Sequence, residues 1–197
     1  MAVMALKPGA RAKEADQKAC LSSGLSVANE PLLSIRPAVE SDVPALIRLL
    51  RRSWLVTWAP ELPFYAVQAF AAADPVPAVV EARWPIMWVA VIGKRLAGRV
   101  DVEGDRLENI EVDPAMWRQG IGQTLLAHSE SLIVRSHAVA FLEVRAFNAR
   151  AIRFYCRHGW KEVRRYPGTE CGAPVENIEM SKSICAAHPP RWRSCER

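Results

Sequence analysis

Residues 110–126 read IEVDPAMWRQGIGQTLL and decide the fold of this chain. An apolar strand runs into a Pro turn, and the turn opens a helix whose first residues include Gly120 and Gly122. Such a turn aims several backbone N–H groups and the positive end of a helix dipole at one point, which suits an anionic phosphate. Glycine is favoured there because a side chain would hold the phosphate away from the backbone. The stretch therefore predicts a phosphate-binding loop.

Three strand-like runs lead up to and into this loop. Gly93-Lys94 and Gly104-Asp105 separate them, and two-residue connections of this kind are typical of antiparallel hairpins. We therefore expect a meander rather than a doubly wound sheet. The three expected strands cover residues 86–92, 96–103 and 107–113.

The chain before the meander predicts one strand and two helices. Pro44 falls in the first turn of the first helix, where its missing N–H costs little, and Ser41 or Asp42 can cap that helix. Prolines near residues 74–85 predict a loop. In order, the expected elements are a strand at 33–37, a helix over 40–54, a second helix over 63–73 and a loop over 74–85.

After Pro114 the apolar spacing becomes helical up to about residue 136. A strand that we expect to be fully buried follows, and then a short helix with Asn148 as its N-cap and Gly159 just past its end. The expected elements in this part are a strand at 138–144, a helix over 148–158 and strands near 160–166 and 175–182.

The composition predicts one soluble domain. The chain has 197 residues, half of them hydrophobic, and no apolar run near the ~20 residues that span a bilayer. We expect residues 1–32 and 184–197 to be tails, and the N-terminal stretch lacks the pattern of a secretory signal, so a cytoplasmic location is expected. The net charge of +5 is spread thinly, which makes a nucleic-acid partner unlikely and leaves no reason to expect a membrane partner. Five scattered cysteines and four histidines show no metal-ligand spacing, so no metal is expected.

Three stretches, in the right order, give the chain a resemblance to the GNAT superfamily of acetyl-CoA-dependent N-acetyltransferases. They are SIRPAVESDVPALIRLL (34–50), IEVDPAMWRQGIGQTLL (110–126) and LEVRAFNARAIRFYCRHGWKEV (142–163). The resemblance covers residues 33–183. It implies an α/β fold of the α+β type, with a mixed, mostly antiparallel central sheet of about seven strands flanked by about four helices.

The resemblance implies direct transfer of the acetyl group of acetyl-CoA to a primary amine of a small molecule or peptide. The alternative is a non-catalytic acyl-CoA-binding sensor or partner module. An acetyltransferase acting on charged tRNA is a third reading, which the modest basic charge does not favour. Relatives are frequently dimers, so a homodimer is possible. The loops at 55–62, 74–85 and 166–174 are expected to shape the choice of acceptor.

The resemblance also assigns the cofactor-binding residues. Arg118 is expected to add charge, Asn148 to contact the CoA arm, and the main chain from Ile110 to Val112 to pair with the pantetheine like an added strand. The backbone amides expected to face the pyrophosphate are those of Gln119, Gly120, Ile121, Gly122 and Gln123. Arg150 or Arg153 either reaches the ribose phosphate or belongs to a solvated helix face. One departure is Trp117, which stands where the family motif has Gln or Arg.

Tyr155 is the candidate general acid for the leaving thiolate, with packing at the helix–sheet interface as the alternative. Glu108 is the candidate general base, with Glu111 behind it. Strand alternation places Glu108 on the same face as the apolar residues Ile110 and Val112, so a carboxylate there requires a bulge or the mouth of a cleft. Trp54 and Trp58 either line an acceptor pocket or belong to the core.

Overall fold

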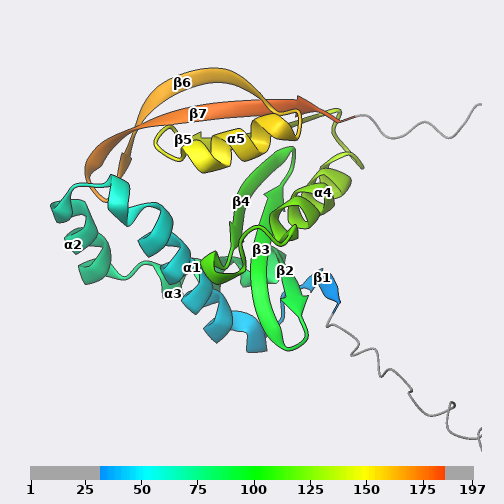
Figure 1. Ribbon diagram of the computed structural model, residues 1–197, viewed down its shortest axis with the longest axis horizontal. Helices are drawn as coiled ribbons and strands as arrows, with labels where there is room; N and C mark the ends of the chain where they lie inside the picture. The colour runs from blue at the N-terminus through cyan, green and yellow to red at the C-terminus, as the bar shows by residue number, and fades with distance from the viewer. Residues whose placement is uncertain (1–31, 185–197) are drawn as a thin grey trace, which may run out of the picture. The chain divides into compact units, whose positions relative to one another are not determined.

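The computed structural model describes residues 32–184 and contains a single seven-stranded sheet (Figure 1). The strand order is β1-β2-β3-β4-β5-β7-β6, and only the β4–β5 pair is parallel. The predicted mixed, mostly antiparallel sheet is confirmed. The strands are β1 (Leu33–Pro37), β2 (Met87–Ile92), β3 (Arg95–Glu103), β4 (Arg106–Val112), β5 (Val139–Arg145), β6 (Lys161–Glu170) and β7 (Ala173–Ser183).

The described residues form five α-helices rather than about four. They are α1 (Val43–Thr57), α2 (Phe64–Ala73), α3 (Val76–Arg83), α4 (Ile121–Ile133) and α5 (Ala149–Arg157). Four 3₁₀ turns lie in the connections before or after them: η1 (Glu40–Asp42), η2 (Ala59–Glu61), η3 (Trp84–Ile86) and η4 (Pro114–Met116).

The additional helix is α3, and the prediction of a loop over residues 74–85 was wrong. Pro77 lies in the first turn of α3, where a helix has no partner for the missing N–H. Prolines at this position therefore mark a helix start rather than a break. The expected loop at 166–174 was also too long, because β6 continues to Glu170 and β7 begins at Ala173.

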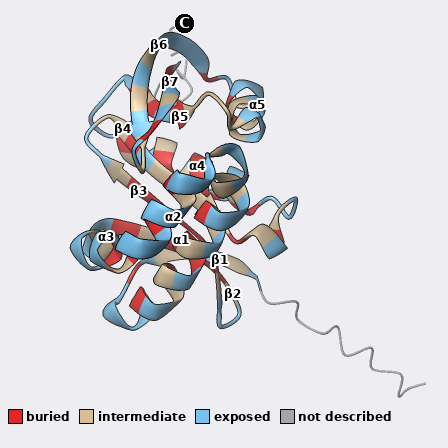
Figure 2. Cartoon of the chain, turned by 90° about the vertical axis from the view of Figure 1, so that its left-hand side faces the viewer, coloured by how far each residue is buried: buried red, intermediate tan, exposed pale blue. Residues whose placement is uncertain are grey.

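Two hydrophobic clusters cover the two faces of the sheet. Val89 of β2 packs into the cluster of α1, α2 and α3, whereas its neighbour Ala90 packs into the cluster of α4 and α5. Successive strand residues point to opposite faces, so the two helix groups lie on opposite sides. Figure 2 shows the buried positions on the strands and on the inward sides of the helices.

The parallel strands β4 and β5 pair over only two residue pairs. Arg106 lies opposite Phe141 and Leu107 opposite Leu142, and no ladder pair follows. The strands then continue separately to Val112 and Arg145. The expectation that these strands are parallel neighbours that separate at one end is confirmed.

The predicted tails, residues 1–32 and 184–197, lie outside the described residues except for Leu32 and Ile184. Ile184 is buried, and its N–H donates to the Ala138 carbonyl at 2.9 Å. The packed structure therefore includes Ile184. Within residues 32–184, no helix has the length and apolar character needed to cross a membrane.

Gly98 of β3 has no room for a side chain. A Cβ there would lie 2.6 Å from the Glu111 carbonyl oxygen and 2.9 Å from Leu125 Cδ1. Gly98→Ala is expected to lower the free energy of unfolding by about 1–3 kcal/mol, measured by urea unfolding, because β4 must shift. Gly122→Ala is the control, since its Cβ would meet Phe154 and Val112 at an ordinary 3.7 Å. Equal stability of the two variants would contradict the close packing of β3 on β4.

Candidate active site

The loop between η4 and α4 has the backbone shape predicted for an anion cradle. Arg118 and Gly120 both adopt the left-handed conformation, with φ of 66° and 78°. Gly120 is the N-cap of α4, and no side chain caps the helix there. A Cβ on Gly120 would meet no atom within 4 Å, so the space beside the loop is open. The first-turn amides of α4 are therefore available to an external anion.

Asp113 anchors this loop to the rest of the fold. Its carboxylate accepts from the Ala115 N–H at 3.0 Å and pairs with Arg52 at 3.1 Å and Arg95 at 3.0 Å. Burial favours the neutral acid, but the Ala115 N–H and the two guanidinium groups outweigh it and lower the pKa of Asp113. The carboxylate joins the loop to α1 and to the start of β3.

Ile110 and Val112 turn their backbone groups away from β3. The Asp113 N–H donates to the Ala97 carbonyl at 2.8 Å. Because bonded and non-bonded pairs alternate along an antiparallel ladder, Glu111 shares the bonds to β3 while Ile110 and Val112 point toward β5. The β4–β5 ladder has ended before these residues. The backbone of Ile110–Val112, which is predicted to pair with a strand-like ligand, thus faces the opening between β4 and β5.

Trp117 forms a hydrogen bond with one of these backbone groups. Its indole N–H donates to the Val112 carbonyl at 3.0 Å. The Arg150 guanidinium carbon lies 3.3 Å from the centre of the Trp117 ring, and Arg150 also donates to the Thr57 hydroxyl at 3.4 Å. The loop, the start of α5 and the end of α1 therefore meet at Trp117.

The remaining predicted cofactor residues fall around the same loop. Gln119 and Gln123 are exposed, Gly122 lies beside Phe154 of α5, and Ile121 is buried as the first residue of α4. Asn148 caps α5 as predicted, because its side-chain oxygen accepts from the Ala151 N–H at 3.1 Å. Its amide NH₂ group has no such role in the cap and keeps its donors.

Tyr155 is buried on α5, next to Phe154 and Trp160. Burial raises the pKa of its phenol above the ordinary value of 10.0, and the negative charge of Glu111 raises it further. The phenol therefore stays protonated at neutral pH. Tyr155 can therefore both pack and donate a proton. Its ring is part of the core, and its phenol is protonated and lies within the electrostatic influence of Glu111 on β4.

Glu108 lies at a bulge in β4. The register with β3 shifts between Asp101, opposite Asn109, and Val102, opposite Leu107, so Glu108 has no opposite residue. Its side chain is 36% exposed and lies 3.8 Å from the Arg106 guanidinium. A carboxylate at position 108 is expected to need a bulge or the mouth of a cleft, and the structure has the bulge.

Glu111 belongs to an ionic network that sequence reasoning missed. Arg99 is 2% exposed and pairs with both Asp101 and Glu111, and Asp101 is 0% exposed and also pairs with Arg83 at 2.6 Å. Burial raises the pKa of the Glu111 carboxyl, and Arg99 offsets only part of that rise. The available signal was the sequence RVDV at 99–102, which places two charges on one face of an otherwise apolar strand.

A second charged cluster lies at the end of β5. Arg145 pairs with Glu143 and with Glu170 at 3.4 Å, and its guanidinium carbon lies 5.2 Å from the centre of the Trp58 ring. The Tyr166 hydroxyl donates to Glu143. A second guanidinium, that of Arg164, lies 5.0 Å from the centre of the Tyr166 ring, so the cluster carries two carboxylates, two guanidinium groups and an aromatic edge from the end of α1.

Trp54 and Trp58, expected together, lie in different surroundings. Trp54 is buried and stacks on Phe70 at 3.6 Å, so it belongs to the core. Trp58 lies against Arg145 and Phe147, at the edge of the β5 cluster. The core alternative therefore holds for Trp54, and an acceptor-pocket role stays a prediction for Trp58.

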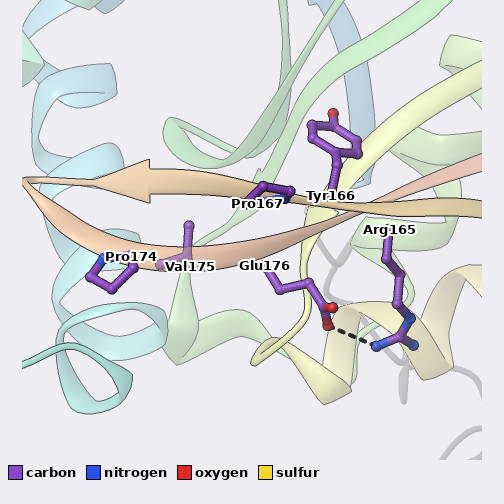
Figure 3. Close-up of a pocket in the computed structure, with 6 residues that line it drawn as sticks. All are labelled: Arg165, Tyr166, Pro167, Pro174, Val175 and Glu176. Carbon is purple, nitrogen blue, oxygen red and sulfur yellow. Dashed lines mark hydrogen bonds and ion pairs between the residues drawn. The ribbon is translucent and has the colours of Figure 1, made fainter.

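The β6–β7 hairpin carries a shallow pocket of about 370 Å³. In Figure 3, Tyr166 and Val175 point to one side of the hairpin, whereas the ion pair of Arg165 and Glu176 points to the other. The Tyr166 side is continuous with Glu143. The hairpin thus extends the β5 cluster toward the edge strand β6.

The described residues contain no group of three or more His, Cys, Asp or Glu that could hold a metal ion.

Comparisons with known proteins show what the chain as a whole is similar to. The acetyltransferase (GNAT) family matches residues 43–160. The ribosomal protein bS18-alanine N-acetyltransferase of Escherichia coli K12 is 48% identical over 69 residues, which are 32% of this chain and 47% of that protein. The same enzyme of Salmonella typhimurium is 46% identical over 66 residues, 31% of this chain and 45% of its own. The chain thus spans about half the length of the curated relatives it matches.

Solved structures share the fold. A GCN5-related N-acetyltransferase from Rhodopseudomonas palustris superposes with a TM-score of 0.68 at 21% identity, covering 79% of this chain and 98% of the other. The Escherichia coli ribosomal-protein-S18-alanine N-acetyltransferase gives 0.58 at 25% identity, covering 81% and 98%. An N-acetyltransferase from Thermoplasma acidophilum, solved with coenzyme A, gives 0.59 at 18% identity, covering 77% and 99%.

Proposed function

Because the chain belongs to the acetyltransferase (GNAT) family, we propose that it transfers the acetyl group of acetyl-CoA to a primary amine, and that this amine is a protein N-terminus. The observation that carries the proposal is the uncapped start of α4 beside the separating strands β4 and β5. A loop of free amides suits the diphosphate, and the free edge of β4 suits the amides of the pantetheine arm.

The residues around the loop fit the cofactor. Gly120 leaves open space in front of the amides, and Arg118 adds an exposed positive charge. The N–H and the carbonyl of Ile110 both point toward β5. Val112 offers a ligand only its N–H, because its carbonyl already accepts the hydrogen bond from the Trp117 indole. Asn148 presents its amide from the start of α5. When bound, acetyl-CoA supplies the activated acyl group as a thioester.

Two kinds of residue in the chain then transfer protons, one from the acceptor amine and one to the leaving thiolate. The entering ammonium first loses one proton to a carboxylate of β4, Glu108 or Glu111. The neutral amine then forms the new C–N bond with the thioester carbonyl carbon, and the acylated nitrogen releases its second proton to water. As the C–S bond breaks, Tyr155 donates its phenolic proton or a hydrogen bond to the thiolate. No covalent acetyl-enzyme is required, because holding both reactants in one site already lowers the barrier.

Two findings favour a protein N-terminus as the acceptor. The curated relatives act on the alanine of ribosomal protein bS18. In this chain, Glu143 and Glu170 place two carboxylates at the end of β5, and a carboxylate there can pair with an incoming ammonium group. Trp58 and Tyr166 border the same cluster and can contact a following side chain.

Turnover separates this proposal from the alternative, a sensor that binds acyl-CoA without catalysis. Purified protein is mixed with acetyl-CoA and peptides that begin with alanine, and released CoA is detected as free thiol. The same peptides with a blocked N-terminus but an internal lysine serve as the control, beside a panel of small amines. Release with the free N-terminus alone supports the proposal. Binding of acetyl-CoA without any release would favour the sensor.

Gly120→Val is expected to weaken acetyl-CoA binding about ten- to a hundredfold, measured by calorimetry, because each lost amide contact to a charged group is worth about 1.5–3 kcal/mol. Gly104→Val is the matched control. It also has a positive φ, 60°, and open space around it, but it lies in the β3–β4 turn. Both variants should lose similar stability, and equal affinities in the two would contradict the cradle.

A further inference from the structure

Arg150 is a cation without a matching anion. Among the residues that the structure describes, no carboxylate lies within ion-pair distance of its guanidinium, which instead contacts the Trp117 ring at 3.3 Å and the Thr57 hydroxyl at 3.4 Å. Partial burial lowers the pKa of Arg150, although a guanidinium remains charged at neutral pH. Arg150 is an exposed residue whose guanidinium is covered on one side by the Trp117 ring, so an anionic ligand can reach it from the other side.

The face of α5 that carries Arg150 borders the anion cradle at both ends. Arg150 touches Trp117, the residue that begins the loop. Phe154, four residues later and on the same helix face, lies beside Gly122, where the loop has become α4. The free guanidinium and the uncapped amides of α4 are therefore complementary to one ligand that carries more than one negative charge.

We propose that Trp117 is a platform that holds Arg150 in position to bind the diphosphate of the cofactor, so that Arg150 is a binding residue and Trp117 a positioning residue. The proposal rests on the function proposed above. Cation–π contact with a tryptophan face fixes the plane of a guanidinium without neutralising it, which leaves its N–H donors for the phosphate oxygens. The bond from the Trp117 indole to the Val112 carbonyl fixes the platform in turn.

Calorimetry with three ligands tests the binding residue. Arg150→Ala is expected to weaken coenzyme A and dephospho-coenzyme A alike, by roughly ten- to a hundredfold, and to leave pantetheine, which has no phosphate, unchanged. Arg157→Ala, an exposed arginine at the far end of α5, is the matched control and should change none of them. Unchanged affinity for dephospho-coenzyme A in Arg150→Ala would overturn the assignment to the diphosphate.

A double-mutant cycle tests the platform. Trp117→Phe keeps an aromatic face and is expected to retain most of the affinity, whereas Trp117→Ala should lose nearly as much as Arg150→Ala. The double variant Trp117→Ala/Arg150→Ala should lose little more than either single variant, because both act on one contact. Losses that add up fully would overturn the positioning role. Urea unfolding of each variant shows whether it is folded.

The wild-type protein separates this inference from the function beneath it. If wild type binds coenzyme A and Arg150→Ala binds it equally well, only the role of Arg150 is lost. If wild type gives no heat and no change in tryptophan fluorescence at millimolar coenzyme A, the proposed function fails and the inference fails with it. Binding that weakens with salt in wild type, and less steeply in Arg150→Ala, supports the charge contact.

Discussion

Replacing Tyr155 with phenylalanine is expected to lower kcat by about a hundred- to ten-thousandfold, the range of general acid catalysis, while the KM for acetyl-CoA stays near wild type. The ring is buried against Phe154 and Trp160, and phenylalanine preserves those contacts. Only the hydroxyl is removed. A loss confined to kcat therefore reports a proton or hydrogen bond that acts in the transition state.

The matched control is Tyr65→Phe, which removes the same hydroxyl from an exposed tyrosine at the start of α2. It should leave both kinetic constants unchanged. The free energy of urea unfolding of Tyr155→Phe should remain within about 1 kcal/mol of wild type, because phenylalanine keeps the ring contacts with Phe154 and Trp160. Full turnover by a folded Tyr155→Phe protein would show that Tyr155 only packs.

Much of the fold could be predicted because the deciding signals are local. The glycine turns at 93–94 and 104–105, the Pro–Gly loop at 114–122 and the Asn148 cap each act over a few residues, and each was found where expected. Helix α3 was missed because proline is compatible with the first turn of a helix as well as with a loop. The local sequence leaves that choice to tertiary packing, here the buried Val76 and Val80.

The site was less predictable than the fold. Residues 110–123, Asn148 and Tyr155 follow from motifs whose chemistry resides in the backbone or in one side chain. The network of Arg83, Arg99 and Asp101 around Glu111 required knowledge of which strands are neighbours and where the bulge lies. Strand periodicity assumes that side chains alternate between the two faces along the whole strand. The bulge at Glu108 interrupts this alternation, so the residues before and after it cannot be assigned to a face from periodicity alone.

The bulge also bears on the general base, for which Glu108 was the first candidate. Glu108 is exposed beside Arg106, whereas Glu111 contributes to the electrostatic surroundings of the Tyr155 phenol and has its carboxyl pKa raised by burial. A base needs a pKa near the working pH. We therefore favour Glu111 as the base, because its pKa is shifted toward neutral pH and Arg99, itself paired with Asp101, holds its carboxylate in place.

Glu111→Gln is thus expected to lower kcat/KM about a hundred- to ten-thousandfold, and Glu108→Gln, the matched variant three residues earlier, less than tenfold. Wild-type kcat/KM should fall as the pH drops through the Glu111 pKa, because the carboxylate must be unprotonated to accept the proton. That pKa is raised, so this contribution to the fall should lie above pH 4.5, the ordinary value for Glu. In Glu111→Gln only the substrate amine, with an α-amino pKa of about 7.7–8.0, still titrates, so the acid limb should be less steep than in wild type. The reverse order of losses would return the role to Glu108, and an unchanged pH limb in both variants would assign the proton to neither carboxylate.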